Sequence, residues 1–205
     1  MRHSLLLWRG CFYFLERRDF MDLINTEPTI FLICGKARHG KTTTGNFMRK
    51  YYESNNKKVA NTLIALYLKT YAEKFFGWDG NPETKPRELL QQLGTEIIRR
   101  KLNKENFFID RTVEDIEILK HFFNVIIIDD IRFPLEINKI KENYNNVYAI
   151  NIIRPDFDSD LSSEQKKHAT ETALDNYDGY DYTIINDADL ETLRNKVVNI
   201  IEEVS

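Results

Sequence analysis

Eight residues near the start of the chain have the types and spacing of a phosphate-binding loop. Gly35, Lys36, Ala37, Arg38, His39, Gly40, Lys41 and Thr42 match the pattern G-x-x-x-x-G-K-[ST] at every fixed position. Glycines let such a loop fold around a phosphate with its backbone N–H groups pointing inward. The following helix adds partial positive charge, Lys41 reaches the β- and γ-phosphates, and the Thr42 hydroxyl can ligate Mg²⁺. We therefore predict a nucleoside triphosphate site that also includes Thr43.

A metal-bound triphosphate needs a carboxylate near the metal. Asp129 directly follows the apolar run Val125–Ile128, where a Walker-B acid would lie beside the loop at the carboxyl edge of a sheet. Asp130 comes next, and because successive strand side chains point to opposite faces, only one of the two is expected to face the metal. We favour Asp129 as the metal ligand, with Asp130 as the alternative.

Further cations could bind a second phosphate. Arg132 lies three residues past Asp129, at the same edge of the predicted sheet, where a guanidinium could clamp a phosphate with two N–H groups. The segment "KPRELLQQLGTEIIRR" places Arg87 and Gln91 near one helical face, which favours a helix that lines a cleft. An ordinary amphipathic helix with a solvated arginine is the equal alternative.

A polar segment at about residues 154–172 is long enough to act as a lid. It begins with Arg154 and contains His168. A lid would keep water from taking the γ-phosphoryl group. A single histidine is more often structural than catalytic, so His168 remains a candidate only.

These residues need a framework of strands and helices. Apolar, β-branched runs predict strands at Thr29–Cys34, Val59–Thr62, "NVIIID" (124–129), Val147–Ile153 and Tyr182–Asn186. Helical spacing predicts helices at Gly40–Tyr52, Leu63–Phe76, Pro86–Leu102, Asp110–His121, Phe133–Asn143 and Asp189–Glu203, with Asp110 and Asp189 as caps. Strands that alternate with helices predict a three-layer α/β fold: a five-stranded parallel sheet with helices on both faces and a small lid.

Composition limits the class of protein. The 205 residues are 42% hydrophobic and 30% charged, with net charge −3, which is typical of a globular domain and provides no general basic field for nucleic acid. Two cysteines exclude a disulfide framework, and Cys34 reads as a buried thiol. The apolar pieces of residues 1–20 are too short to span a bilayer, so no membrane partner is expected. We interpret residues 1–20 as a peripheral extension, since Met21 offers a second start.

Several segments together resemble one family, the deoxynucleoside monophosphate kinases of phages and bacteria. They are "GKARHGKTT", "LYLKTYAEKFFG", "RELLQQLGTEIIR", "IIDDIRFPLE", "NIIRP", "HATE" and "YTIIND", spread over about residues 29–201. The combination of "LLQQLGTE", "DIRFPLE" and "HATE" carries the resemblance. The chain departs from the family where Thr42 follows the lysine and where leucine precedes Glu136, which leaves the acceptor base open.

The resemblance implies transfer of the γ-phosphoryl group of ATP, with Mg²⁺, to the 5′-phosphate of a nucleotide. Lys69, Arg87 and Arg132 would hold the acceptor phosphate, with Gln91 and His168 also at the acceptor, while Lys41, Arg132 and Arg154 would act on the transferring group. The resemblance also implies an extension (1–28) followed by a kinase domain (29–205). It further implies a cytoplasmic location. A homodimer stays open.

Two other classes of function compete with this interpretation. A kinase of another phosphorylated metabolite, such as dephospho-coenzyme A or phosphomevalonate, would use the same loop. A regulatory nucleotide triphosphatase would too, although a switch GTPase should carry N-K-x-D, which "INDAD" does not supply.

Overall fold

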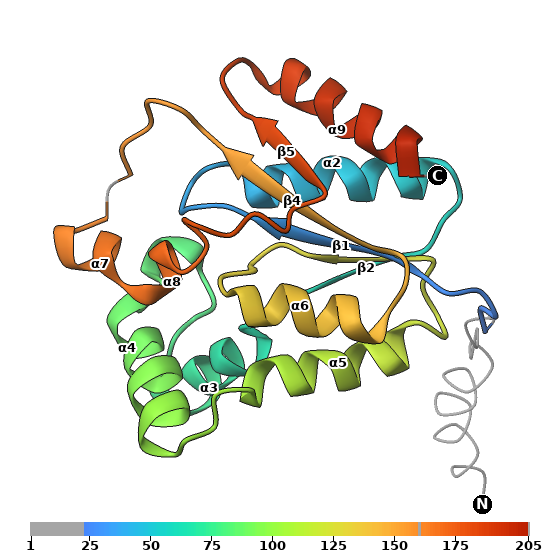
Figure 1. Cartoon of the computed structure of the whole chain (residues 1–205). Helices are drawn as coiled ribbons and strands as arrows, with labels where there is room; N and C mark the ends of the chain where they lie inside the picture. Colours follow the sequence, from blue (N-terminus) through green and yellow to red (C-terminus); the bar gives the residue numbers. More distant parts are fainter. Residues whose placement is uncertain (1–22, 160, 205) are drawn as a thin grey trace, which may run out of the picture.

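The computed structural model describes residues 23–159 and 161–204, and its centre is a five-stranded parallel sheet (Figure 1). The strands are β1 (Thr29–Cys34), β2 (Val59–Thr62), β3 (Val125–Ile128), β4 (Val147–Ile153) and β5 (Tyr182–Ile185), in the order β2-β3-β1-β4-β5. Every neighbouring pair is parallel. The central strand β1 thus leads into the phosphate loop with a neighbour on each side.

Helices cover both faces of the sheet. In chain order they are α2 (Lys41–Ser54), α3 (Leu66–Phe76), η1 (Pro82–Thr84), α4 (Arg87–Gln91), η2 (Gln92–Lys101), α5 (Phe107–Leu119), α6 (Pro134–Asn143), α7 (Ser163–Lys167), α8 (Ala169–Thr172) and α9 (Leu190–Val204). Helices α2 and α9 lie on one face, and α5 and α6 lie on the other (Figure 1). The three-layer parallel fold predicted from the sequence is confirmed.

Strand β1 separates two apolar cores because its side chains alternate between the faces. Ile30 and Leu32 pack with residues of α5 and α6, and Phe31 and Ile33 pack with residues of α2 and α9. All four are fully buried. Burial on both faces explains why the strand is a continuous apolar run.

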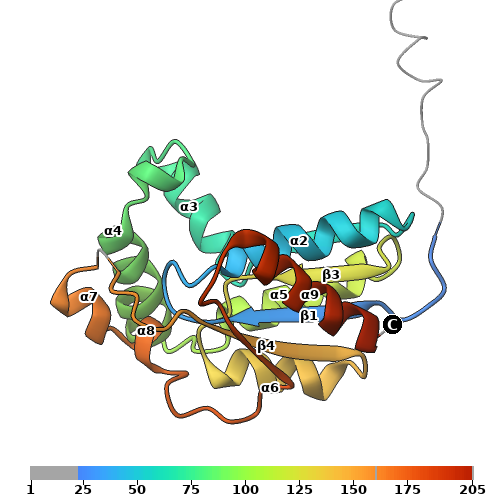
Figure 2. The same cartoon turned by 90° about the horizontal axis from the view of Figure 1, so that it is seen from above.

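Small helices gather at the carboxyl end of the sheet. Figure 2 shows α3 and α4 on one side of this end and α7 and α8 beside them, next to the loop between β1 and α2. The other helices pack along the strands. The carboxyl end is where open parallel sheets hold ligands, so the small helices enclose the expected site.

Several predicted helix boundaries were wrong; the helix predicted at Gly40–Tyr52, for example, is Lys41–Ser54. The helix predicted from Leu63 begins at Leu66, because the carboxylate of Asp130 accepts hydrogen bonds from the N–H groups of Ile64 and Ala65 and holds a turn there. Asp110 does not cap α5, which already begins at Phe107; its carboxylate pairs with Lys139 on α6 instead. The predicted helix 133–143 begins at Pro134, with Phe133 as its N-cap residue.

The segment 86–102 was predicted as one helix of a single type. It is α4 followed by ten residues of π-helix, η2, with Pro86 at the cap position. By contrast, the cap of α9 is confirmed, since Asp189 Oδ1 accepts from Thr192 N–H at 2.8 Å.

Two expectations concern the chain outside the sheet. The predicted extension 1–20 lies outside the described residues. Within the described part of the chain, no helix is both long enough and apolar enough to cross a membrane.

Cys34, the last residue of β1, is buried, as expected, and burial raises the pKa of its thiol.

Candidate active site

The phosphate loop has two positions that only glycine fits. Gly35 has φ +138°, and a Cβ there would lie 2.5 Å from the carbonyl oxygen of Ile152. Gly40 has φ +107°, and a Cβ there would lie 2.8 Å from Nδ2 of Asn186, which donates to the His39 carbonyl at 2.9 Å. The backbone conformation and the close contacts from β4 and from Asn186, which follows β5, therefore explain both glycines of the motif.

Lys41 is folded back onto its own loop. Its Nζ donates to the carbonyl oxygens of Gly35 at 2.8 Å and Lys36 at 2.7 Å, and the residue is 8% exposed. Burial and the nearby Arg132 lower the pKa of Lys41 to about 7. An anion in the loop would offset both effects, because it favours the charged form of the lysine.

His39 and Arg154 join the loop to the end of β4. His39 Nδ1 lies 3.2 Å from the carbonyl oxygen of Ile152 and 3.1 Å from the backbone N of Arg154. Burial lowers the pKa of His39. The Arg154 guanidinium stacks on Phe157, 4.2 Å from the ring centroid, and stays near the loop.

A second pocket lies where α2 begins, between the loop and α9. Arg38, Gly40, Thr43, Arg154 and Asn186 line part of it, and the rest comes from Ala188 to Leu193 at the start of α9. The pocket therefore adjoins the phosphate loop.

The two candidate metal ligands have different neighbours. Gly45 lies one turn past Thr42 on α2, and a Cβ at Gly45 would be 3.7 Å from Cβ of Asp129. Asp129 therefore lies beside the face of α2 that carries Thr42. The carboxylate of Asp130 accepts from Ile64 N–H at 2.7 Å and Ala65 N–H at 3.1 Å, and burial raises its pKa.

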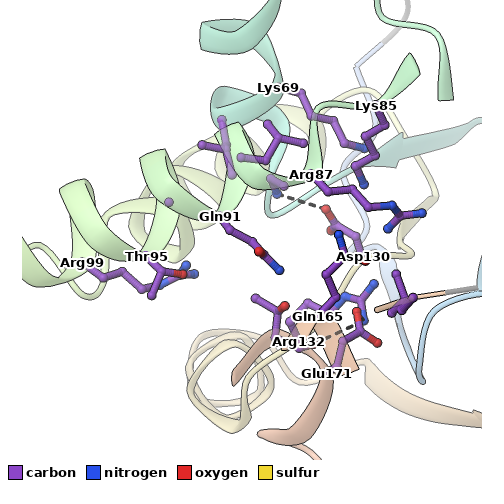
Figure 3. A pocket seen from close by; sticks show the side chains of 16 residues that line it. Lys69, Lys85, Arg87, Gln91, Thr95, Arg99, Asp130, Arg132, Gln165 and Glu171 are labelled. Atoms are coloured by element: carbon purple, nitrogen blue, oxygen red, sulfur yellow. Dashed lines mark hydrogen bonds and ion pairs between the residues drawn. The ribbon is translucent and has the colours of Figure 1, made fainter. Parts of the chain in front are cut away.

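Another cavity opens beside the loop and receives residues from four segments (Figure 3). From α3, α4 and η2 come Ala65, Leu68, Lys69, Lys85, Arg87, Leu90, Gln91, Gly94, Thr95 and Arg99; from the end of β3 come Asp130 and Arg132; and from the lid segment come Leu161, Gln165, Thr170 and Glu171. Lys69, Arg87, Gln91 and Arg132, which the sequence predicted at an acceptor, are thus brought together. His168 is not among the lining residues.

His168 has a local structural contact. Its Nδ1 accepts from Thr170 N–H at 3.3 Å and lies 3.0 Å from the Thr170 hydroxyl oxygen, so the ring caps α8. It positions the residues of "HATE" that do line the cavity.

One end of the cavity is strongly cationic. Lys69, Lys85, Arg87 and Arg132 converge there, with Asp130 and Glu171 as partial counter-charges. Burial and the neighbouring Lys69 and Arg87 lower the pKa of Lys85 to about 8. The sequence-based prediction omitted Lys85. Its position directly before Pro86 and Arg87 was the available signal, because that segment was already predicted to line a cleft.

The α4–η2 change of helix type keeps a row of side chains aligned. Arg87, Gln91, Thr95 and Arg99 are spaced by four residues and all line the cavity. In an α-helix of 3.6 residues per turn, such a row would drift steadily around the axis. A π-turn contains more residues, so it reverses the drift. A long π-helix is rare and often marks a functional site.

The far end of the cavity contains a fixed guanidinium. Arg99 lies between the rings of Phe108 at 5.0 Å and Phe133 at 4.7 Å, and its Nη2 is 3.6 Å from Oε1 of Glu136. Oε2 of Glu136 accepts from the N–H groups of Arg132 at 2.8 Å and Phe133 at 3.1 Å. The buried Glu136 thereby connects the two ends of the cavity, and burial raises its pKa to about 7.

One protein-family model matches a large part of this chain. The model described as deoxynucleotide monophosphate kinase matches residues 78–197, from the turn before η1 into α9. The chain belongs to the deoxynucleotide monophosphate kinase family. It is therefore a phosphotransferase of the nucleotide-kinase type, as the resemblance of its motifs predicted. A search of curated proteins found no match.

Solved structures share the fold. APS kinase of Mycobacterium tuberculosis in complex with AMPPNP and APS has a TM-score of 0.51 and 9% identity, and the match covers 86% of this chain and 98% of that one. A Cys556Ala mutant of the same kinase gives a TM-score of 0.51 with 6% identity and the same coverage. At such low identity these matches support the P-loop kinase fold alone.

Proposed function

We propose that this member of the family transfers the γ-phosphoryl group of ATP to the 5′-phosphate of a deoxynucleoside monophosphate. The observation that carries the proposal is the cationic end of the cavity between α3, α4, η2 and the lid segment, where Lys69, Lys85, Arg87 and Arg132 converge beside the phosphate loop. A dianionic phosphate is the ligand such a group of cations suits. The apolar and polar wall from Leu68 to Arg99 has the mixed character of a base and sugar site.

The loop and the second pocket would hold the donor. In this proposal the backbone of Gly35–Thr43 cradles the phosphates, and Lys41 turns from its contacts with the loop carbonyls to the β- and γ-phosphates. Arg154 borders both the loop and the second pocket, where the donor base would lie. AMPPNP, an ATP analogue, is bound in one of the structures of similar fold.

The residues present fit a Mg²⁺ ion. Thr42 is exposed at the start of α2, and Asp129 lies beside the same face of that helix. Mg²⁺ is commonly held by one or two protein oxygens together with substrate phosphates, which matches this donor set. No group of three acidic, histidine or cysteine residues that could bind a metal is found in the described chain. When bound, the ion would neutralise charge on the phosphates.

Little acid–base chemistry is needed. The attacking oxygen belongs to a phosphate that is already an anion, so positioning and charge neutralisation supply most of the catalysis. Arg132 lies between the cavity and the loop, because it lines both the acceptor cavity and the pocket along Gly35, Lys36 and His39. It would contact the phosphoryl group as it passes from donor to acceptor.

The proposal is tested by ADP formation in a coupled assay against all common nucleoside and deoxynucleoside monophosphates. We expect a deoxynucleotide to be phosphorylated and Lys41→Ala, which should fold normally, to abolish the reaction. If only dephospho-coenzyme A or phosphomevalonate were phosphorylated, that metabolite would be the acceptor instead of a deoxynucleotide. ADP formation that does not depend on any acceptor would favour a regulatory triphosphatase.

A further inference from the structure

Glu171 places a carboxylate against the phosphate loop. Its Oε2 accepts a hydrogen bond from the backbone N–H of Ala37 at 3.0 Å, although the two residues are 134 positions apart in the sequence. Ala37 is the third residue of the loop whose N–H groups are expected to bind phosphate. An anion of this chain thus occupies a donor that a bound phosphate would use.

The same carboxylate also pairs with the arginine between donor and acceptor. Oε1 of Glu171 lies 2.8 Å from Nη1 of Arg132, which in addition donates to the Thr170 carbonyl at 3.3 Å. The side chains of Arg132 and Glu171 are 25% and 11% exposed, so the pair is largely shielded from water. The negative charge of Glu171 also raises the pKa of Lys41, although burial and Arg132 lower that pKa by more.

Glu171 lies where the spaces that the proposed function assigns to the acceptor and to the phosphate loop meet. Glu171 and Arg132 line both the acceptor cavity and the pocket along the loop, so they stand between the two (Figure 3). A γ-phosphoryl group on its way to the acceptor must pass between these spaces.

We infer that the Glu171 carboxylate is a placeholder for the γ-phosphoryl group: it occupies Ala37 N–H and Arg132 in the ligand-free enzyme and must leave when ATP binds. The inference rests on the proposed function, since it takes Arg132 and the loop as phosphate ligands. The lid segment that carries Glu171 makes a second contact with the loop, an ion pair between Asp175 and Lys36 at 2.9 Å. Release of Glu171 would free Arg132 for the phosphate and would move α8.

The test compares affinities for AMPPNP and for ADP, each with Mg²⁺, by calorimetric titration of the full chain without acceptor. Glu171→Gln keeps the size of the side chain and removes its charge, so a γ-phosphate no longer competes with a carboxylate. We expect AMPPNP to bind roughly fivefold more tightly than to the unchanged enzyme, with ADP affinity nearly constant. The ratio of the two affinities is the readout, because a purely structural role would change both alike.

Asp175→Asn is the matched control, because it removes a carboxylate of the same segment that touches the loop through the Lys36 side chain instead of a backbone N–H. Its ratio should not change. An unchanged ratio for Glu171→Gln, or weaker AMPPNP binding, would overturn the inference. A parallel loss for both nucleotides with a lower Tm would identify Glu171 as a structural brace instead. None of these measurements requires phosphoryl transfer, so the absence of kinase activity would count against the proposed function alone.

Discussion

At the residue scale, Asp129 and Asp130 adjoin in the sequence but have different neighbours, from which we predict different roles. Asp130 holds the turn before α3 through two backbone N–H groups, and Asp129 lies beside the face of α2 that carries Thr42. Alternation of side chains along β3 and beyond separates them, as the sequence predicted. Which one serves the metal stays a prediction.

Replacing each aspartate with asparagine should distinguish these tasks. Asp129→Asn should raise the Mg²⁺ requirement and lower turnover with little change in Tm. In Asp130→Asn, the side-chain NH₂ group cannot accept a hydrogen bond, so one of the N–H groups of Ile64 and Ala65 loses its acceptor. This loss costs about 1–3 kcal/mol of unfolding free energy, so the Tm of this variant should fall. Mg²⁺ titrations of activity and thermal unfolding measure the two effects. The reverse assignment would hold if Asp130→Asn alone changed the Mg²⁺ requirement.

Lys85 gives the acceptor site a predicted pH dependence. Its pKa of about 8 in the ligand-free protein results from burial first and then from Lys69 and Arg87. Above pH 8, Lys85 of the free enzyme would lose its proton and its positive charge. An acceptor phosphate would then bind less well, because it interacts favourably with the charged form of Lys85. With ATP saturating, kcat/KM for the acceptor should therefore decrease as pH rises through about 8.

Lys85→Arg checks the assignment, since arginine keeps its charge throughout this range. We expect the alkaline decrease to weaken or move to higher pH. Lys69→Arg in the same cavity is the control and should retain the decrease. If the profile of Lys85→Arg matched that of the unchanged enzyme, another group would be responsible for it.

At the element scale, the helix η2 shows what sequence patterns miss. The spacing of apolar residues in "RELLQQLGTEIIRR" indicates a helix, and one is present, but the same spacing does not separate an α- from a π-helix. Leu68 of α3 packs against η2 so closely that a Cβ at Gly94 would lie 3.1 Å from its Cδ2, and the sequence pattern does not reveal such a contact. Glu171 was missed because its partners, Arg132 and Ala37, are 39 and 134 positions away in the sequence.

The phosphate loop was predictable because its requirements are local. Two glycines, a lysine and a hydroxyl at fixed spacing between a strand and a helix are sufficient to specify it. The sheet was equally accessible, since a strand buried on both faces is a continuous apolar run. The acceptor cavity is assembled from segments far apart in the sequence, so only parts of it could be predicted.

Gly94→Ala should disturb the acceptor wall alone. A Cβ at this position would lie 3.1 Å from Cδ2 of Leu68 and 3.8 Å from Nη1 of Arg99. Alanine also favours a helix over glycine by about 1 kcal/mol, so we expect Tm to change little. The acceptor KM should rise several-fold, and the Kd for ATP should stay the same. Glu96→Ala, on the exposed side of η2, is the control; an equal change in KM for both variants would contradict a specific role of Gly94.

At the scale of the whole molecule, the sites proposed for donor and acceptor belong to different parts of the chain. The loop follows β1 and the second pocket reaches α9, whereas the acceptor cavity lies between α3, α4, η2 and the lid segment; the two pockets share no lining residue. Arg132, at the end of β3, is next to both the loop and the cavity. Mutations on the two sides should therefore separate in their kinetics.

Arg87→Ala and Arg132→Ala test this separation. Each removes a charge-assisted contact of about 1.5–3 kcal/mol with the acceptor phosphate, so kcat/KM for the acceptor should decrease roughly ten- to a hundredfold. ATP affinity should hardly change in Arg87→Ala, since the loop holds the triphosphate and Arg87 lines the acceptor cavity and not the pocket along the loop. Lysine should restore only part of the loss, because a point charge cannot reproduce a two-pronged contact. Steady-state kinetics with either substrate varied, together with ATP titrations, measures each effect.

The two arginines should differ in one respect. Arg87 belongs to the cavity alone, so its loss should act mainly on the acceptor KM. Arg132 stands between the cavity and the loop and should lower kcat as well, because it can contact the phosphoryl group during transfer. An equal loss of ATP binding in both variants would place these arginines at the donor site or in the structural core. If neither variant changed the acceptor kinetics, the acceptor phosphate would have to bind elsewhere on the enzyme.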